Sequence, residues 1–267
     1  MQPNITGCIC LLMDQFIKIN SLKKVFGEGD DEVHAFGPVD ISINSGEFVS
    51  VLGPSGCGKS TLMLMMAGLL EPTSGEIFFD DKSVEGPKND IGIMFQDNTL
   101  VPWRTVEGNI KLQLELRNLD INAYKDKIFN ILKSVKLEDF ANRYPSELSG
   151  GMQQRAAFCQ AMIHEPNTIL LDEPLGKLDA MTREKIRSDI QNLWMINKPT
   201  VVFVTHSIEE AVQLSSRVIL ISPRPGVVDR EINIDLPYPR DLNVKRSNKF
   251  FEYVHEIQEV FHEYGVI

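Results

Sequence analysis

The loop that sets the architecture of this chain is Gly53-Pro54-Ser55-Gly56-Cys57-Gly58-Lys59-Ser60, followed by Thr61. It matches the pattern Gly-x-x-x-x-Gly-Lys-Ser of a phosphate-binding loop. The glycines permit a tight turn whose backbone N–H groups face phosphate oxygens, and the Lys59 ammonium can bind the β- and γ-phosphates of a nucleotide. The Ser60 hydroxyl is a candidate Mg²⁺ ligand. The sequence therefore predicts a nucleotide site at this loop.

The segments on either side of the loop have the character that the motif requires. Phe48–Leu52 is a short apolar run typical of a buried strand, and residues 61–68 are apolar enough for a buried helix. A helix that begins at the loop would point its positive end at the bound phosphates. The order strand, loop, helix favours a true phosphate-binding loop over a chance match in a turn.

The composition is ordinary for a soluble globular protein. The chain has 267 residues, of which 43% are hydrophobic and 24% charged, and its formal net charge is −10. Such acidity argues against a nucleic-acid binder that relies on overall charge. No apolar run reaches the roughly 18 residues of a membrane-spanning helix. The length suits one large domain, or a core with an inserted subdomain.

The four cysteines are Cys8, Cys10, Cys57 and Cys159. They have neither zinc-site spacing nor a disulfide-rich context, which indicates a reducing cytoplasm. Cys57 lies in the phosphate-binding loop, where a helix N-terminus could lower its pKa. We favour the alternative that Cys57 is a small residue that simply fits there.

The periodicity of the remaining chain predicts a parallel α/β core interrupted by helices. Residues 14–52 are strand-rich, and residues 106–157 have the apolar spacing of helices. Residues 182–197 are expected to form an amphipathic helix. Further strands are expected at 90–96, 168–171, 201–204 and 218–221. The last three are continuous apolar runs, typical of strands in a sheet that is covered on both faces.

Both ends of the chain carry a weaker signal. Residues 1–12 are predicted to be a dispensable N-terminal extension, or a non-native one if the chain starts at Met13. Near the other end, 223–226 is predicted to be a turn and 237–239 an extended link. One helical face in the tail is expected to pack on the core, with a regulatory or partner-binding role as the alternative; it carries Phe250, Val254, Ile257 and Phe261.

Polar residues follow two of the predicted strands. Asp172 ends the strand 168–171 and can hold Mg²⁺, directly or through water, and Glu173 is then placed to accept a proton from the attacking water. His206 comes just after the strand 201–204, at the sheet edge where ligands of open α/β sheets bind. It could donate a hydrogen bond to the γ-phosphate. The alternatives are a solvated turn for the acids and a structural role for the histidine.

A second anion site is predicted at Leu148-Ser149-Gly150-Gly151-Met152-Gln153-Gln154-Arg155. Ser149, Gly150 and Gly151 offer a hydroxyl and bare N–H groups at the start of a helix. One nucleotide has a single γ-phosphate, which the first loop already binds. A second phosphate-binding helix end is useful if it serves a nucleotide on another copy of the chain; the alternative is an ordinary Ser-capped helix.

Taken together and in order, these motifs resemble those of ATP-binding cassette (ABC) ATPases. The segment 148–155 is similar to their signature motif, and 176–179 to the loop that crosses their dimer interface. The resemblance implies ATP and Mg²⁺ as cofactors. It implies catalytic roles for Glu173, His206, Gln96 and Lys59. It implies nucleotide binding by Phe26, by Gly53 to Thr61 (Gly53, Pro54, Ser55, Gly56, Cys57, Gly58, Lys59, Ser60, Thr61), and by Ser149, Gly150, Gly151 and Asp179. It implies metal binding by Ser60, Gln96 and Asp172.

The fold implied is α/β: a P-loop NTPase core with a parallel sheet, an N-terminal antiparallel β subdomain and an inserted α-helical subdomain. The resemblance covers roughly residues 14–222. We expect an ATPase domain at 13–222, with its helical insert at about 97–157, and a C-terminal extension at 223–267 that packs on the core.

A finer resemblance is to the ATPases of nitrate, sulfonate and taurine importers, carried by residues 96–106 and by Ser222-Pro223-Arg224-Pro225-Gly226. Gly108 and Lys177 depart from that group, whose members usually have an acid and a small residue there. The resemblance implies a head-to-tail homodimer at the cytoplasmic face of the membrane, two membrane-spanning permease subunits, an extracytoplasmic solute-binding protein, and no nucleic acid. A non-transport ABC ATPase or a regulatory cassette is the alternative.

Overall fold

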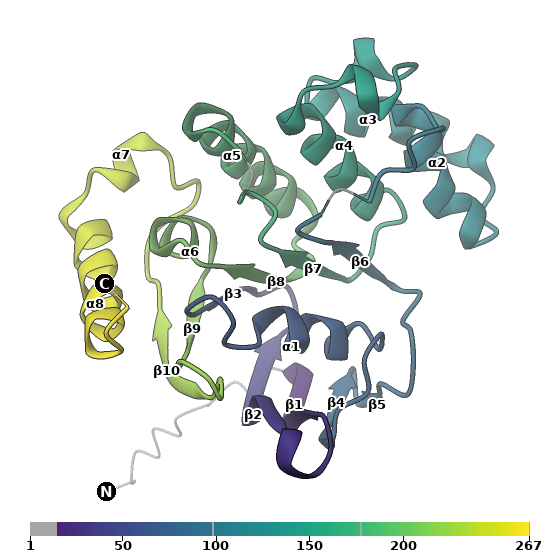
Figure 1. Cartoon of the computed structure of the whole chain (residues 1–267). Coiled ribbons are helices and arrows are strands. Elements are labelled where there is room, and N and C mark those ends of the chain that lie inside the picture. Colours follow the sequence, from purple (N-terminus) through teal and green to yellow (C-terminus); the bar gives the residue numbers. More distant parts are fainter. Residues whose placement is uncertain (1–14, 98, 177, 267) are drawn as a thin grey trace, which may run out of the picture.

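The computed structural model of this chain describes residues 15–97, 99–176 and 178–266, which form two sheets flanked by helices (Figure 1). The strands are β1 (Gln15–Phe26), β2 (Val33–Asn44), β3 (Phe48–Leu52), β4 (Ser74–Phe79), β5 (Lys82–Ser83), β6 (Ile91–Met94), β7 (Thr168–Asp172), β8 (Thr200–Thr205), β9 (Arg217–Ile221) and β10 (Val228–Asn233). The α-helices are α1 (Lys59–Met66), α2 (Val106–Leu116), α3 (Lys125–Ser134), α4 (Gly150–Met162), α5 (Ala180–Asn197), α6 (Ile208–Leu214), α7 (Leu242–Lys245) and α8 (Asn248–Glu263). Short 3₁₀ helices lie at η1 (Gly29–Asp31), η2 (Ile121–Tyr124), η3 (Glu138–Phe140) and η4 (Pro145–Glu147).

The larger sheet has six strands in the order β10-β9-β3-β8-β7-β6, and all of them except β10 run parallel. Val49 on β3 pairs with Val202 on β8 and with Arg217 on β9. The strands β3, β7 and β8 are buried along their whole length, as expected where helices or a second sheet cover both faces. Because β3 lies inside the sheet, the loop after it opens at the middle of the carboxyl edge.

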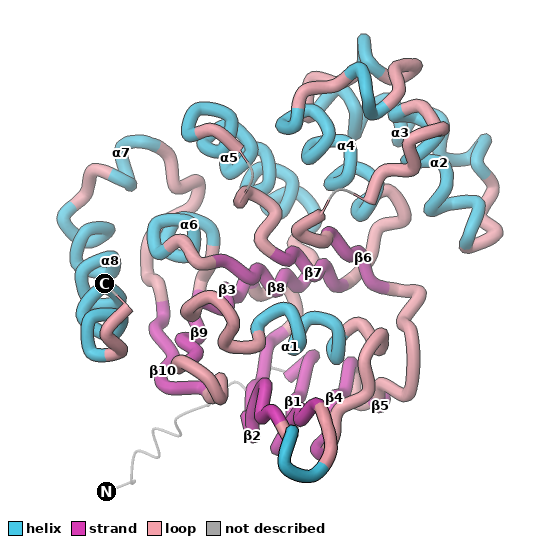
Figure 2. Tube along the Cα trace, in the orientation of Figure 1, coloured by secondary structure: helices cyan, strands magenta, loops and turns pink. Residues whose placement is uncertain are grey.

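One face of this sheet packs against α1 and the smaller sheet. The smaller sheet is antiparallel, with the order β2-β1-β4-β5. The buried cluster between the layers joins Val51 of β3 and Val204 of β8 to Leu62 and Met66 of α1 and Ile19 of β1. Figure 2 shows α1 between the strands of the two sheets. This packing fixes the helix that begins at the phosphate-binding loop.

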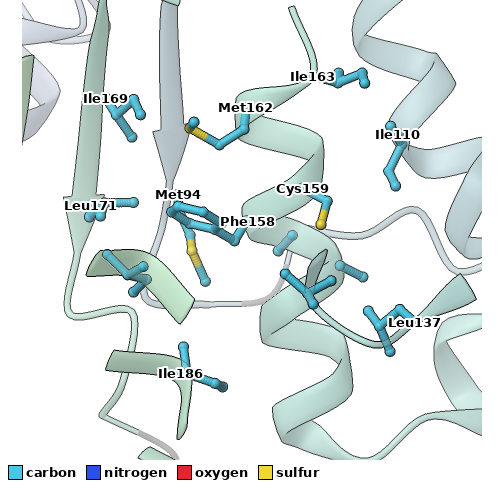
Figure 3. Close-up of a cluster of buried hydrophobic side chains, with 14 of the residues drawn as sticks. Met94, Ile110, Leu137, Phe158, Cys159, Met162, Ile163, Ile169, Leu171 and Ile186 are labelled. Carbon is cyan, nitrogen blue, oxygen red and sulfur yellow. The ribbon is translucent and has the colours of Figure 1, made fainter. Parts of the chain in front are cut away.

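The other face packs against α4 and α5. In Figure 3, Phe158 and Met162 of α4 lie beside Met94 of β6 and Ile169 of β7, with Ile186 of α5 nearby. The same cluster continues into α2 and α3, so the helical segment shares its core with the sheet. Cys159 is fully buried there, and burial raises its pKa to about 12, which makes its thiol unreactive.

The C-terminal segment packs on the far edge of the larger sheet. Phe250, Ile257, Val260 and Phe261 of α8 are buried against α6, β9 and β10. Val254, the remaining residue of the face named from the sequence, packs against the same cluster and is partly buried. The segment 237–239, expected to be an extended link, is more than a spacer, because the Tyr238 ring lies 4.9 Å from that of Trp194.

The predicted fold class is confirmed, and each predicted strand and helix named above has a counterpart within a few residues. The antiparallel sheet also takes in β4 and β5, which follow α1 in the sequence. Residues 1–12 and Lys177 lie outside the described residues. No described helix has the length and apolar character needed to cross a bilayer.

The stability of this fold should depend on His164, which follows α4. Burial, assisted by the Arg117 guanidinium, lowers the pKa of His164 to about 4, while its Nε2 lies 3.3 Å from the Ile91 carbonyl oxygen. The unfolded chain protonates this histidine near pH 6.5, so its contribution is fully present above pH 6.5 and is lost as the pH falls towards 4. Because the side chain is only partly buried, we expect a loss of about 1–2 kcal/mol. Urea titrations at several pH values should show that His164→Gln reduces the pH dependence of the free energy of unfolding. If the variant keeps the pH dependence of the wild type, this role of His164 is contradicted.

Candidate nucleotide site

The phosphate-binding loop needs glycine at its ends for measurable steric reasons. Gly58 caps α1 with φ of 99°, and a Cβ there would lie 2.6 Å from the Ala35 carbonyl oxygen. A Cβ on Gly53 would lie 2.8 Å from the Ile221 carbonyl oxygen and 2.9 Å from Cys57 Sγ. The loop is therefore clamped between β2 and β9, which fixes the direction of its N–H groups.

A cavity of about 360 Å³ opens over this loop. It is lined by Phe26, Ala35, Ser55, Gly56, Gly58, Lys59, Ser60, Thr61, Gln96, Glu173 and Arg224. Phe26 is 43% exposed, and the Lys24 ammonium lies 5.2 Å from its ring centroid. A half-exposed ring at the cavity wall suits stacking by an adenine base.

Lys59 is held by the loop itself. Its Nζ donates hydrogen bonds of 2.8 Å to the carbonyl oxygens of Gly53 and Pro54, and only 4% of the residue is exposed. Gly53, Pro54 and Cys57 do not line the cavity. Cys57 is buried, and that burial raises the pKa of its thiol despite the nearby ammonium. A raised pKa argues against a reactive thiol, and so it supports the interpretation that Cys57 is simply a small residue that fits in the loop.

Asp172 is placed to bind a cation. It ends β7 at 7% exposure, and its Oδ1 has no hydrogen-bond partner among the described residues. Burial and the neighbouring Glu173 carboxylate raise its pKa, and a hydrogen bond from Ser60 opposes that shift. A buried carboxylate oxygen beside a serine hydroxyl fits Mg²⁺, which prefers oxygen ligands and usually completes its shell with phosphate oxygens and water.

The Glu173 side chain, which follows β7, contacts residues that follow β6 and β8. Its Oε2 accepts a hydrogen bond of 3.0 Å from Gln96 Nε2 and lies 3.3 Å from His206 Nδ1. Its backbone N–H donates to the Val204 carbonyl, and its φ is 43°, a conformation that side chains rarely adopt. The chain thus holds the Glu173 carboxylate, on a strained backbone, between a glutamine and a histidine at the cavity wall. That arrangement suits a base that accepts a proton from water.

The second predicted anion site lies elsewhere in the chain. Ser149 caps α4, and its hydroxyl accepts from the Met152 N–H at 3.4 Å. Asp179 caps α5 in the same manner. None of Ser149, Gly150, Gly151 and Asp179 lines the cavity. Figure 1 places α4 across the six-stranded sheet from α1.

The two signature glycines have different surroundings, which gives a matched pair of variants. A Cβ on Gly150 meets no atom within 4 Å, whereas a Cβ on Gly151 would lie 2.3 Å from Thr182 Cγ2 on α5. Gly151→Ala should therefore lower the free energy of unfolding by about 1–3 kcal/mol, and Thr182→Ser, which removes the clashing methyl group, should restore it. Gly150→Ala should unfold like the wild type while losing ATP-dependent self-association. Denaturant titrations measure the stability of each variant, and sedimentation measures its self-association. Equal losses of stability in both variants would contradict the different roles given to Gly150 and Gly151.

The fold and the cavity define a P-loop nucleotide-binding protein. A protein-family model described as "ABC transporter" matches residues 36–176. The uncharacterized ABC transporter ATP-binding protein MJ0412 of Methanocaldococcus jannaschii is 41% identical over 244 residues, which cover 91% of this chain and 90% of that protein. The aliphatic sulfonates import ATP-binding protein SsuB of Bacillus cereus is 41% identical over 249 residues, which cover 93% and 96%.

A solved structure agrees with these sequence matches. The dimeric, post-hydrolysis structure of the ATP-binding cassette MJ0796, bound to ADP and Pi, aligns with a TM-score of 0.73 at 34% identity over 82% of this chain and 98% of that one. The chain belongs to the ABC transporter family. The expectations that it is an ATPase and that it uses ATP with Mg²⁺ are confirmed.

The structure also shows residues that the sequence did not single out for the site. Arg224 lines the cavity from the loop between β9 and β10; the motif around it was recognised, but without a role. Glu210 is buried on α6 and accepts a 2.7 Å hydrogen bond from Thr205, whose hydroxyl in turn accepts from the Ser207 N–H. These bonds hold the loop that carries His206. Nothing in the sequence distinguishes Glu210, which is buried, from the exposed Glu209 beside it.

Proposed function

We propose that this chain is the ATP-hydrolysing subunit of an importer for a small solute of the sulfonate class. It would act as a head-to-tail dimer at the cytoplasmic face of the membrane. One observation carries the dimer: the cavity beside Lys59 and the cap formed by Ser149 and Gly150 are separate within one chain. In the dimer, each ATP would lie between Lys59 of one copy and Ser149 of the second. The dimeric form of MJ0796 supports this arrangement.

The dimer would couple ATP to motion through its own equilibrium. If ATP contacts both copies, it binds the closed pair better than the open one and shifts the population towards closure. Hydrolysis then removes the ligand that favours the closed pair. Under this proposal Glu173, Gln96 and His206 act on the γ-phosphate end of the nucleotide, and Asp172 with Ser60 holds the Mg²⁺.

A rigid, exposed loop offers a contact for the membrane subunits. The fully buried Asn109 side chain donates to the carbonyl oxygens of Val101, Arg104 and Thr105 at 3.0–3.1 Å, and accepts from the Val101 N–H. These bonds fix residues 101–105, while Trp103 stays 78% exposed. An exposed indole on a fixed loop that follows Gln96 in the sequence suits docking of each of the two permease subunits. An extracytoplasmic solute-binding protein would deliver the solute to these subunits.

The solute class follows from the relatives and from two segments of this chain. Several similar proteins of Bacillus species are named for aliphatic sulfonate import. Residues 96–106 and 222–226 resemble those of the nitrate, sulfonate and taurine group. Selectivity among these anions would reside in the membrane and receptor subunits. The domain division at residues 13–222 and 223–267 is part of the same proposal.

Growth experiments test the solute class. A strain that lacks this chain should lose growth on an alkanesulfonate as sole sulfur source and keep growth on sulfate, and the wild-type chain but not Lys59→Ala should restore it. Loss of growth on nitrate as sole nitrogen source instead would reassign the solute. Unchanged growth on both sources would contradict import, provided that the purified chain hydrolyses ATP.

The sequence left two alternatives to an importer, a regulatory cassette and an ATPase acting on DNA or ribosomes. The close contacts that join Gln96, Glu173 and His206 favour hydrolysis over a regulatory role. The net charge of −10 disfavours a nucleic-acid partner. A steady-state ATPase assay with and without the membrane subunits separates these alternatives from the importer.

A further inference from the structure

The loop between β9 and β10, residues 222–227, lies against the phosphate-binding loop. A Cβ on Gly226 would lie 1.9 Å from the Cys57 carbonyl oxygen, so the two backbones are in direct contact. Gly37 of β2 donates a 2.8 Å hydrogen bond to the Gly226 carbonyl. The hairpin tip is thus held between the phosphate-binding loop and the smaller sheet.

The loop is also fixed internally. Ser222 and Val227 pair through their backbones at 2.9 Å, and the Ser222 hydroxyl accepts from the Val227 N–H at 3.1 Å. Pro223 and Pro225 restrict the backbone on either side of Arg224. The base of the Arg224 side chain is therefore held in place beside the cavity that it lines.

The Arg224 guanidinium is free to bind a ligand. Across the described ranges, no hydrogen bond or ion pair involves it, whereas Arg217, at the start of β9, is paired with Glu47 and Glu231. A guanidinium binds phosphate oxygens through several N–H groups and stays charged at any physiological pH. An unpaired arginine at the wall of a nucleotide cavity, in a chain of net charge −10, is an anion contact.

The strand order indicates which part of the nucleotide Arg224 would meet. The phosphate-binding loop follows β3; β9 lies on one side of β3, and β8 and β7 lie on the other. Glu173 and His206, at the ends of β7 and β8, mark the γ-phosphate end. Arg224 follows β9, on the opposite side of β3, and lines the cavity together with Phe26. The α- and β-phosphates lie between the adenine and the γ-phosphate.

We infer that Arg224 binds the α- and β-phosphates of the nucleotide, as a positive charge that the hairpin tip supplies in addition to Lys59. This assignment rests on ATP binding in the cavity and is independent of the proposed import. Such a contact would affect nucleotide affinity and not the chemical step, because a contact to the α- and β-phosphates is the same before and after hydrolysis. Arg224 therefore sets affinity for ATP and ADP alike.

Equilibrium binding to the purified full chain tests the inference. Arg224→Ala should weaken ATP and ADP about tenfold each, a difference typical of one charge-assisted contact, and leave adenosine unchanged. The KM for ATP should rise while kcat stays near the wild-type value, and Arg224→Lys should recover part of the affinity. Arg246→Ala removes the same charge from an exposed position between α7 and α8 and should change nothing.

Three outcomes would overturn the inference: ATP and ADP affinities within twofold of the wild type, a loss confined to ATP, or an equal loss for adenosine. The second would place Arg224 on the γ-phosphate and the third on the base. Lys59→Ala serves as the reference. If it abolishes ATP binding while Arg224→Ala does not weaken it, only the role of Arg224 fails, and the nucleotide site stands. Unchanged melting temperature of Arg224→Ala shows that the loop keeps its fold.

Discussion

Glu173→Gln should reduce steady-state ATP hydrolysis by at least about a hundredfold while leaving ATP binding intact, because it removes the group that accepts the proton from water. Glutamine keeps the size of the side chain and can still accept the hydrogen bond from Gln96, which now measures 3.0 Å. The nucleotide would then remain unhydrolysed. We expect an ATP-bound dimer to accumulate, visible by size-exclusion chromatography only when ATP is present.

The matched control is Glu209→Gln, the same chemical change at an exposed position on α6. It should hydrolyse ATP at the wild-type rate and show no trapped dimer. A Glu173→Gln protein that keeps more than about a tenth of the wild-type rate would remove Glu173 from the role of base, since general base catalysis typically contributes a hundredfold or more.

Arg240→Ala should lower the free energy of unfolding by about 3 kcal/mol, the largest stability effect that we predict for this chain. Arg240 is 1% exposed although it is an arginine. Its guanidinium donates to the carbonyl oxygens of Val212, Ser215, Ile234 and Leu236 at 2.6–3.3 Å. It also lies 4.2 Å from the Tyr238 ring centroid.

These bonds tie the C-terminal segment to α6, the helix that follows His206. Truncation leaves buried carbonyl groups without their donor and removes the stacked contact with the ring. Urea titration measures the effect, and Arg246→Ala, at an exposed position, is the control. A change of less than about 1 kcal/mol, the range of ordinary surface substitutions, would contradict the role given to Arg240.

The strands of the core were predictable because their burial is complete. β7, β8 and β9 are continuous apolar runs, and the phosphate-binding loop marks the end of β3. β10 was missed, since Val-Asp-Arg-Glu-Ile-Asn has Ile232 as its one buried residue and pairs only along one edge. The buried Arg240 was missed because arginine is normally exposed, and its acceptors are backbone carbonyls that no sequence pattern records.

The candidate site divides in the same way. Motif residues such as Lys59, Glu173 and Gln96 could be named because their spacing is fixed by the chemistry of phosphate binding, and the structure places them around one cavity. Arg224 reaches that cavity only through the pairing of β9 with β3, a contact between segments far apart in the sequence. Gly151 was predicted to bind the nucleotide. The structure gives a second reason for glycine there, because a Cβ at this position would clash with Thr182 of α5.

The central claim is that one chain supplies two complementary halves of a nucleotide site and must pair with a second copy to complete it. The test uses two parent proteins that both carry Glu173→Gln. The first also carries Lys59→Ala, and the second carries a bulky replacement of the signature serine, Ser149→Arg. A mixed pair of these parents retains one intact site, because Lys59 comes from one copy and Ser149 from the other.

The most direct measurement is ATP-dependent association of the two parents, each labelled with a different fluorophore and followed by energy transfer. The account predicts association when the parents are mixed with ATP, and none for either parent alone or without nucleotide. If the mixture associates no better than each parent alone, although both proteins are folded by circular dichroism and the Glu173→Gln protein itself pairs with ATP, the composite site is contradicted.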